Sequence, residues 1–157
     1  MRVKNILTLL LTILAAILLY SCTMTLTNRN NVSVSVPYSV TKGYFVKNTF
    51  SPDSIECTII RDQIMLDSLL GMAATMGKNE MPTRIDFGRQ FAIACMHPET
   101  DSDVQLEAKE LKMTDDRLTL RLSIIRGENQ SYTIVPLQLL VVEGNPPTFL
   151  ECELEKR

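Results

Sequence analysis

The sequence predicts an α+β fold, in which one main helix packs on a curved antiparallel sheet of about five to six strands. Two observations support this prediction. Apolar residues recur at helical spacing over residues 61–74. After residue 83, apolar and polar residues alternate in several short runs, a pattern typical of strands with one buried face.

The N-terminus predicts an exported protein. Arg2 and Lys4 precede an apolar run over residues 6–20, which is shorter than the roughly 20 residues that a membrane-spanning helix needs. A positive start, a short apolar run and small residues near its end are typical of a signal peptide, here residues 1–21. An uncleaved N-terminal anchor helix remains the alternative.

The end of this segment, Leu19-Tyr20-Ser21-Cys22, resembles the lipobox of bacterial lipoproteins, which has a leucine three residues before the cysteine and a small residue directly before it. The resemblance implies that Cys22 starts the mature chain and carries acyl groups, such as palmitate, that anchor it to a membrane. Thr23 stands where an aspartate would retain a lipoprotein in the inner membrane. We therefore expect an outer-membrane lipoprotein on the periplasmic face rather than the cell surface.

The remaining chain is long enough for one domain. Residues 22–31 are the lipidated cysteine and a polar stretch typical of a flexible tether, and residues 32–157 form the single expected α+β domain. The leader removes two positive charges and no acid, so the net charge falls from −2 to −4. This balance argues against a nucleic-acid partner, which would require a basic face.

The first elements of the domain are two short strands, over residues 32–36 and 44–46, and a segment over 55–60 that fits either a strand or the approach to a helix. The helix over 61–74 follows. Its apolar face holds Met65, Leu66, Leu69, Leu70 and Ala73. Asp62 stands near its start, where a carboxylate accepts free amide N–H groups, and Pro82 prevents its continuation.

The rest of the chain predicts strands joined by turns. We expect these strands over residues 85–95, 104–108, 111–113, 117–124, 132–142 and 150–154. Residues 114–117 predict one turn and residues 127–129 predict the closing turn of a hairpin. Pro136 predicts a bend or an edge position within the long strand that contains it.

Three cysteines remain besides Cys22. Cys57, Cys95 and Cys152 allow at most one disulfide with one thiol left over. Cys95 and Cys152 lie in apolar strand patterns, where a cysteine behaves as a small core residue, so we favour three reduced thiols and leave a disulfide open. The spacings match no zinc or CxxC pattern, and we predict no metal and no cofactor.

The sequence offers few catalytic candidates. His97 is the only histidine, it precedes Pro98, and no GxSxG motif accompanies it. We expect an exposed histidine in a turn after a strand. The acidic loop that contains Glu99 lacks the glycine and the glutamate of an EF-hand. Asp86, at the start of a strand, is expected to be buried or to cap the preceding loop.

Three segments, residues 43–48, 71–77 and 82–94, together resemble a group of uncharacterised small lipoproteins of Gram-negative bacteria. The helix followed by Ile85-Asp86-Phe87 and a strand is similar to a family of B-type protease-complex components and to other protease-inhibitor-like domains. The resemblance implies a compact α+β binding domain without catalytic residues. Residues 96–99 depart from that family, because they lack the glycine of its turn.

We therefore predict a membrane-anchored, non-enzymatic binding lipoprotein, with inhibition of a secreted peptidase as the activity that the resemblance implies. Binding would use rigid loops or an edge strand. The candidate loop residues are Met81, Pro82, His97, Pro98, Asn145 and Pro146. Two alternatives remain, an envelope hydrolase that uses His97 and a purely structural envelope protein.

Overall fold

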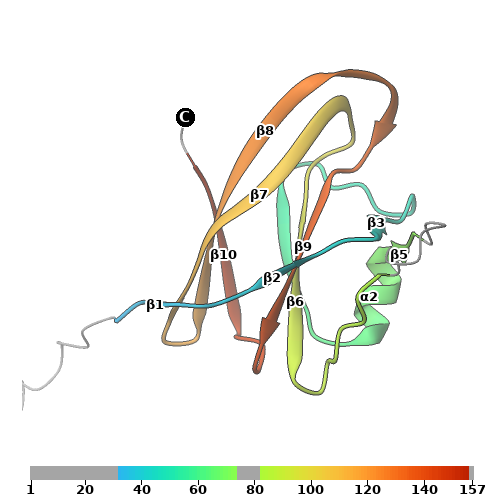
Figure 1. Cartoon of the computed structure of the whole chain (residues 1–157). Helices are drawn as coiled ribbons and strands as arrows, with labels where there is room; N and C mark the ends of the chain where they lie inside the picture. Colours follow the sequence, from blue (N-terminus) through green and yellow to red (C-terminus); the bar gives the residue numbers. More distant parts are fainter. Residues whose placement is uncertain (1–31, 74–81, 156–157) are drawn as a thin grey trace, which may run out of the picture. The chain divides into compact units, whose positions relative to one another are not determined.

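The computed structural model describes residues 32–73 and 82–155, which belong to one compact unit. Of these residues, 59% lie in strands and 6% in a helix, so the expected α+β fold is wrong. The described residues form two four-stranded sheets, a small two-stranded sheet and one short helix (Figure 1). The predicted lipid site Cys22 lies outside the described residues. No helix within the described ranges is long and apolar enough to cross a membrane.

The first sheet, sheet A, contains the two longest strands. Its order is β1 (Val34–Ser35), β7 (Thr100–Thr114), β8 (Arg117–Ile134) and β10 (Phe149–Leu154). β7 pairs antiparallel with both of its neighbours, whereas β10 runs parallel to β8. The two segments expected at 104–108 and 111–113 are one strand, with a bulge between Ala108 and Glu110. Side chains satisfy the backbone at this bulge, because Ala108 donates to Gln138 and accepts from Tyr38.

The second sheet, sheet B, is antiparallel throughout. Its order is β2 (Ser39–Thr41), β9 (Leu137–Glu143), β6 (Gln90–Met96) and β4 (Glu56–Ile60). β6 is central and buried on both faces, as its nearly continuous apolar sequence requires. Sheet B is therefore the middle of three layers.

One core fills the space between sheets A and B. Strict alternation on β8 turns Leu118, Leu120 and Leu122 inward, where all three are fully buried. From sheet B, alternate residues of β6 such as Phe91 and Ile93 complete this core. The sequence correctly predicts a strand with one buried face over 117–124, but the layer that covers this face is a second sheet and not a helix.

The other face of sheet B is covered by a second core. Here α2 (Gln63–Leu69) and the sheet formed by β3 (Tyr44–Val46) and β5 (Leu70–Met72) pack on Ala92, Ala94 and Met96 of β6. Asp62 is the N-cap predicted for the helix, and its carboxylate accepts the Met65 N–H at 2.7 Å. The helix is shorter than expected, because residues 70–72 extend to pair with β3.

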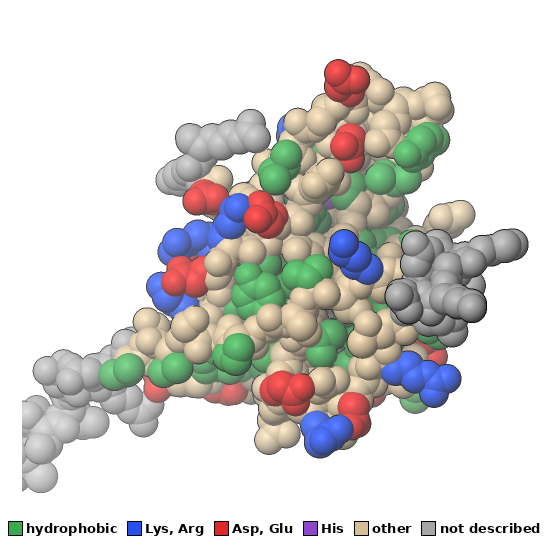
Figure 2. Space-filling view, viewed as in Figure 1, with side chains coloured by type: hydrophobic (Ala, Val, Ile, Leu, Met, Phe, Trp, Pro, Cys, Tyr) green, Lys and Arg blue, Asp and Glu red, His purple; other side chains and the backbone are tan. Residues whose placement is uncertain are grey.

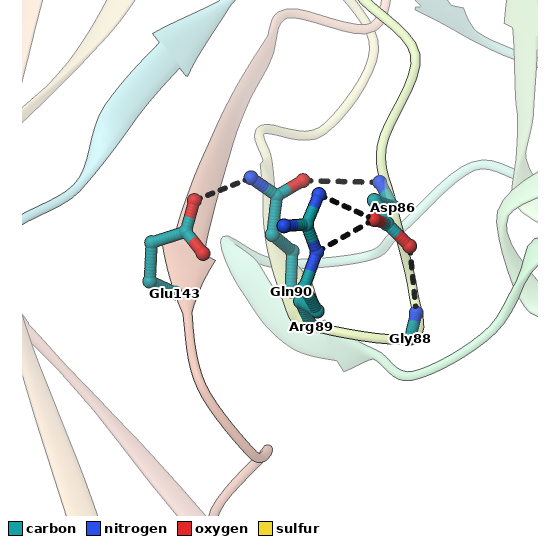
Figure 3. A network of polar contacts seen from close by, with 5 residues as sticks. All are labelled: Asp86, Gly88, Arg89, Gln90 and Glu143. Carbon is teal, nitrogen blue, oxygen red and sulfur yellow. Dashed lines mark hydrogen bonds and ion pairs between the residues drawn. The ribbon is translucent and has the colours of Figure 1, made fainter.

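A polar network precedes β6, in the segment expected to begin a strand at residue 85 (Figure 3). Asp86 is exposed and accepts the Gly88 N–H at 3.1 Å and the Arg89 side chain at 2.9 Å. Gln90 accepts the Asp86 N–H at 3.0 Å and donates to Glu143 at 2.6 Å. Asp86 thus caps a turn, and β6 begins only at Gln90.

The β7–β8 ribbon turns at Asp115 and Asp116, as residues 114–117 predict, and Asp115 has a φ of 53°. The turn expected at 127–129 is wrong, because β8 continues through these residues to Ile134. The long strand expected over 132–142 is divided at Pro136, which cannot donate a ladder hydrogen bond. There the chain crosses from sheet A to sheet B.

Candidate functional site

The loop residues predicted from the sequence do not converge on one surface. Met81 lies outside the described residues, and Pro82 packs near Gly43. His97 and Pro98 follow the end of β6 that pairs with Leu137. Residues 144–148 follow the opposite end of sheet B. These positions remain candidate contacts, but they cannot form one continuous site.

His97 is buried, with 7% of its surface exposed, so the expectation of an exposed turn histidine is wrong. Its backbone N–H donates to the Pro136 carbonyl at 2.9 Å, and its Nδ1 lies 2.8 Å from the Pro98 carbonyl. Within the described part of the chain, no thiol or carboxylate is hydrogen-bonded to the ring. His97 helps to join the end of β6 to the segment before β9.

The loop with Asn145 and Pro146 is fixed by contacts at its base. The Pro147 carbonyl accepts the Arg61 guanidinium at 2.8 Å, and the Thr148 N–H donates to the Asp116 carboxylate at 3.1 Å. These bonds hold the loop beside the β7–β8 turn. Asn145 itself is exposed.

The clearest surface feature without a role in the core is an arch at the far end of the β7–β8 ribbon. We define the arch as residues 100–103 of β7 and 126–134 of β8, and Figure 1 shows it bending over at the top of the view to reach β9. Nearly all of its β8 residues are exposed on both faces of the strand. Figure 2 shows hydrophobic side chains on this part of the surface.

Local polar contacts hold the arch together. Ser102 donates to Asn129 at 3.0 Å, and Thr133 donates to Glu99 at 2.6 Å. Gly127 allows the two strands to approach closely, because a Cβ there would come within 3.0 Å of the Asp103 carboxylate. An exposed two-stranded ribbon is only marginally stable by itself, so these contacts and the attachment to both sheets maintain its shape.

A groove of about 260 Å³ lies where the end of the arch meets β3. We call it the arch groove. It is lined by Phe45, Val46, Asn48, Phe50, Ser51, Glu99, Thr133, Ile134 and Val135. Phe45 is 47% exposed and Ile134 is 39% exposed, so two large apolar side chains from separate elements face solvent around one hollow.

The position of Phe45 depends on Gly71, its partner across the β3–β5 pair. A Cβ added at Gly71 would lie 2.4 Å from Cζ of the Phe45 ring. The absence of a side chain at Gly71 thus makes room for the ring. One face of the ring is supported by β5, and the ring also contributes to the groove wall.

The polar groups of the arch groove can bind a ligand by hydrogen bonds. Within the described ranges, neither the Asn48 amide nor the Ser51 hydroxyl has a protein partner, and both residues are exposed. Among the described residues that line the groove, Glu99 alone is charged, and its carboxylate already accepts the Thr133 hydroxyl. The groove therefore combines apolar walls with a few donors and acceptors, a composition typical of ligand sites.

Two larger hollows have less favourable linings. One, of about 430 Å³, lies along β8 and is lined by mixed charges that include Glu107, Lys109, Arg126 and Glu155. The other, of about 360 Å³, lies between β2 and the crossing of β7 and β9 and is formed largely by strand residues already paired in the sheets. Neither brings two exposed apolar anchors together.

Phe45 and Ile134 were not predicted from the sequence as surface residues. A signal was present for Phe45, because alternation in Tyr44-Phe45-Val46 places the central side chain on the face opposite Val46, which is buried. Ile134 carried no such signal, since the strand over 132–142 was expected to continue through it.

Among the described residues, no group of histidine, cysteine and acidic side chains could hold a metal ion.

Comparison with known proteins finds no matching family model, no similar curated protein and no similar solved structure.

Proposed function

We propose that this protein is a lipid-anchored, non-enzymatic binding lipoprotein that holds an extended segment of a partner protein in the arch groove. The observation that carries the proposal is the pairing of Phe45 and Ile134 around one hollow, beside the polar groups of Asn48 and Ser51, which have no hydrogen-bond partner among the described residues. An extended peptide places apolar side chains on one face and polar backbone groups at its edges. The groove offers partners for both.

The two apolar anchors can supply useful binding energy. A phenylalanine side chain buries on the order of 200 Å² when it is fully covered, and about half of the Phe45 surface remains exposed. Covering that half would contribute about 2–3 kcal/mol before the cost of ordering the ligand. Because the groove is small, we expect modest affinity and a partner that contacts the arch as well.

The anchor in this proposal is Cys22, whose acyl groups would hold the domain close to the outer membrane, on its periplasmic face. Metabolic labelling with an alkyne analogue of palmitate tests this part directly. We expect the full chain to incorporate the label and a Cys22→Ala variant to lose it. Equal labelling of the two chains would contradict lipidation at Cys22.

Binding is tested with the full chain in detergent micelles and fluorescein-labelled decapeptides that alternate apolar and polar residues. We expect a rise in fluorescence anisotropy with some peptides of this panel. Phe45→Ser should weaken that binding about tenfold or more, since the ring is a wall of the groove. Phe149→Ser is the matched control, because Phe149 is 55% exposed on β10 but is absent from the groove lining.

If no peptide binds, or if both phenylalanine variants bind as the wild type does, the arch groove is not the binding site. The labelling experiment on Cys22 is independent of this outcome. Failure at the groove therefore leaves the anchoring part of the proposal intact.

Inhibition of a secreted peptidase is the narrower form of this proposal, and the sequence resemblance supports it. The relevant assay incubates the full chain with secreted serine and cysteine peptidases and measures their residual activity on a chromogenic substrate. We expect stoichiometric loss of activity with at least one peptidase, and relief of inhibition by Phe45→Ser. Unchanged activity across the set would remove inhibition and leave the wider binding function.

A further inference from the structure

Three cysteines that are distant in sequence meet at one side of the sandwich. Cys57 lies on β4, Cys95 on β6 and Cys152 on β10. The Sγ atom of Cys57 is 2.7 Å from that of Cys152 and 3.0 Å from that of Cys95. Cys57 therefore stands between one candidate partner in its own sheet and another in the facing sheet.

Both the distance between the sulfur atoms and their access to solvent favour a bond between Cys57 and Cys152, which lie on different sheets. The Cys57–Cys152 contact is the shorter of the two, and both residues are only partly buried. Cys95 has no exposed surface and is Cys57's direct neighbour across the β4–β6 ladder. Since thiol oxidation depends on access to the sulfur, an external oxidant can reach Cys57 and Cys152 more easily than Cys95.

We propose that Cys57 and Cys152 form a disulfide that ties β4 to β10, while Cys95 remains a reduced thiol in the core. Each of the two thiols loses one proton and one electron when the S–S bond forms. A disulfide-containing oxidant accepts both electrons and both protons and becomes two thiols. Oxidised glutathione can supply this step in vitro, and a thiol–disulfide oxidoreductase can supply it outside the cytoplasm.

The position of this bond gives it a clear structural role. β4 is one of the two edge strands of sheet B, and β10 is one of the two edge strands of sheet A. The bond would join the two sheets at an edge of the sandwich. It would also link residues 95 positions apart, and closing such a long loop restricts the unfolded chain strongly.

Ionisation of the thiols controls how fast the bond forms. The contact with Cys57, followed by burial, raises the pKa of Cys152. For Cys57, the contact with Cys152 lowers the pKa, but the contact with Cys95 and burial together outweigh it and raise the pKa overall. Because the thiolate is the attacking form, oxidation of the reduced folded protein is slow at neutral pH and becomes faster as the pH rises.

Peptide mapping identifies the bond without ambiguity. Trypsin cleavage after lysine and arginine places Cys57 in residues 48–61, Cys95 in residues 90–109 and Cys152 in residues 127–156. The full chain in detergent micelles is treated with oxidised glutathione, free thiols are alkylated under denaturing conditions, and the unreduced digest is analysed by mass spectrometry. We expect residues 48–61 linked to 127–156, and an alkylated Cys95.

A link between residues 48–61 and 90–109, a link to Cys22, or alkylation of Cys57, Cys95 and Cys152 together would overturn the proposal. Cys95→Ala should retain the expected link, and Cys57→Ala should lose it. As an independent measure, reduction should lower the thermal midpoint of the oxidised wild type by roughly 10 °C or more. The midpoint of Cys152→Ala should be insensitive to reduction, and an unchanged midpoint in the wild type would also contradict the bond.

Discussion

The ring of Phe45 occupies the space in which a side chain on Gly71 would stand, since an added Cβ would lie 2.4 Å from Cζ of the ring. The two residues face each other across the β3–β5 pair. A glycine on one strand thus determines where an exposed aromatic side chain on the other can lie. This relationship links the short sheet, which covers the second core, to the wall of the arch groove.

Gly71→Ala should therefore displace the Phe45 ring. We expect a loss of about 1–3 kcal/mol in the free energy of unfolding, the usual cost of an added methyl group in a close contact, together with weaker peptide binding. Urea denaturation and fluorescence anisotropy measure the two effects. Gly71→Ala combined with Phe45→Ser removes the clash, so this double variant should recover most of the lost stability but not the binding. A double variant no more stable than Gly71→Ala would show that the ring is not the cause.

Truncating a leucine in the core between sheets A and B should lower the free energy of unfolding more than truncating one at the edge of the sandwich. Leu120 is fully buried on β8, and Leu120→Ala should lower the free energy of unfolding by about 2–5 kcal/mol. Leu154 on β10 is 47% exposed, so the matched change Leu154→Ala should cost less than about 0.5 kcal/mol. Urea denaturation of both variants compares them, and equal losses would contradict the assignment of Leu120 to the core.

Local sequence patterns predicted the individual strands better than the way in which the strands form sheets and layers. The alternation over 117–124 correctly identified a strand with one buried face, but alternation does not reveal what covers that face. The covering layer for Leu118 and Leu120 is β6 and its neighbours, which belong to a second sheet. The length of the helix was also overestimated, because residues 70–72 have helical spacing in the sequence but pair with β3 in the fold.

Among the polar and thiol sites, short-range contacts were again easier to predict from the sequence than long-range ones. Asp62 and Asp86 act on amides within a few residues, so their capping roles follow from short-range sequence. The role of Asp62 was expected, and capping was one of the two alternatives expected for Asp86. The meeting of Cys57 with Cys152 depends on how two sheets face each other across 95 positions of sequence. No local pattern contains that information, so the sequence did not reveal that these two sulfurs meet.

The Asp86 carboxyl should have a pKa below the ordinary value for aspartate. Its hydrogen bond to Arg89, followed by that from the Gly88 amide, lowers the pKa of this exposed carboxyl below 3.8. A lowered pKa means that the charged carboxylate stabilises the turn above about pH 3.8 and that this contribution is lost as the pH falls through the lower folded value. Carbon-13 NMR of the Asp86 carboxyl measures the midpoint.

Arg89→Ala should raise the Asp86 midpoint, because it removes the largest cause of the shift. Lys112→Ala is the control, since Lys112 pairs with Glu110 at a different place on the surface. We expect the control to leave the Asp86 titration unchanged. If Arg89→Ala leaves the midpoint in place, the guanidinium contact shown in Figure 3 does not control this carboxyl.

The reduced protein should lose stability in alkaline solution. Contacts among the sulfurs and burial hold the pKa of Cys57 and of Cys152 above 9.0, the ordinary value, in the folded state. Well below pH 9 both thiols are protonated in either state, and their contribution to folding is complete. Above it, the unfolded chain releases these protons while the folded chain retains them, so the free energy of unfolding falls as the pH rises.

Urea denaturation at pH 7, 9 and 10 under a phosphine reductant measures this fall. The double variant Cys57→Ala/Cys152→Ala is the control, because it retains the other groups whose pKa is raised by folding, such as Tyr44, whose pKa burial raises above 10.0. The reduced wild type should lose more stability between pH 9 and 10 than this variant loses. The oxidised wild type should behave like the variant, since a disulfide has no thiol proton to release. Parallel curves for the reduced wild type and the variant would show that the two sulfurs do not hold their protons in the folded protein.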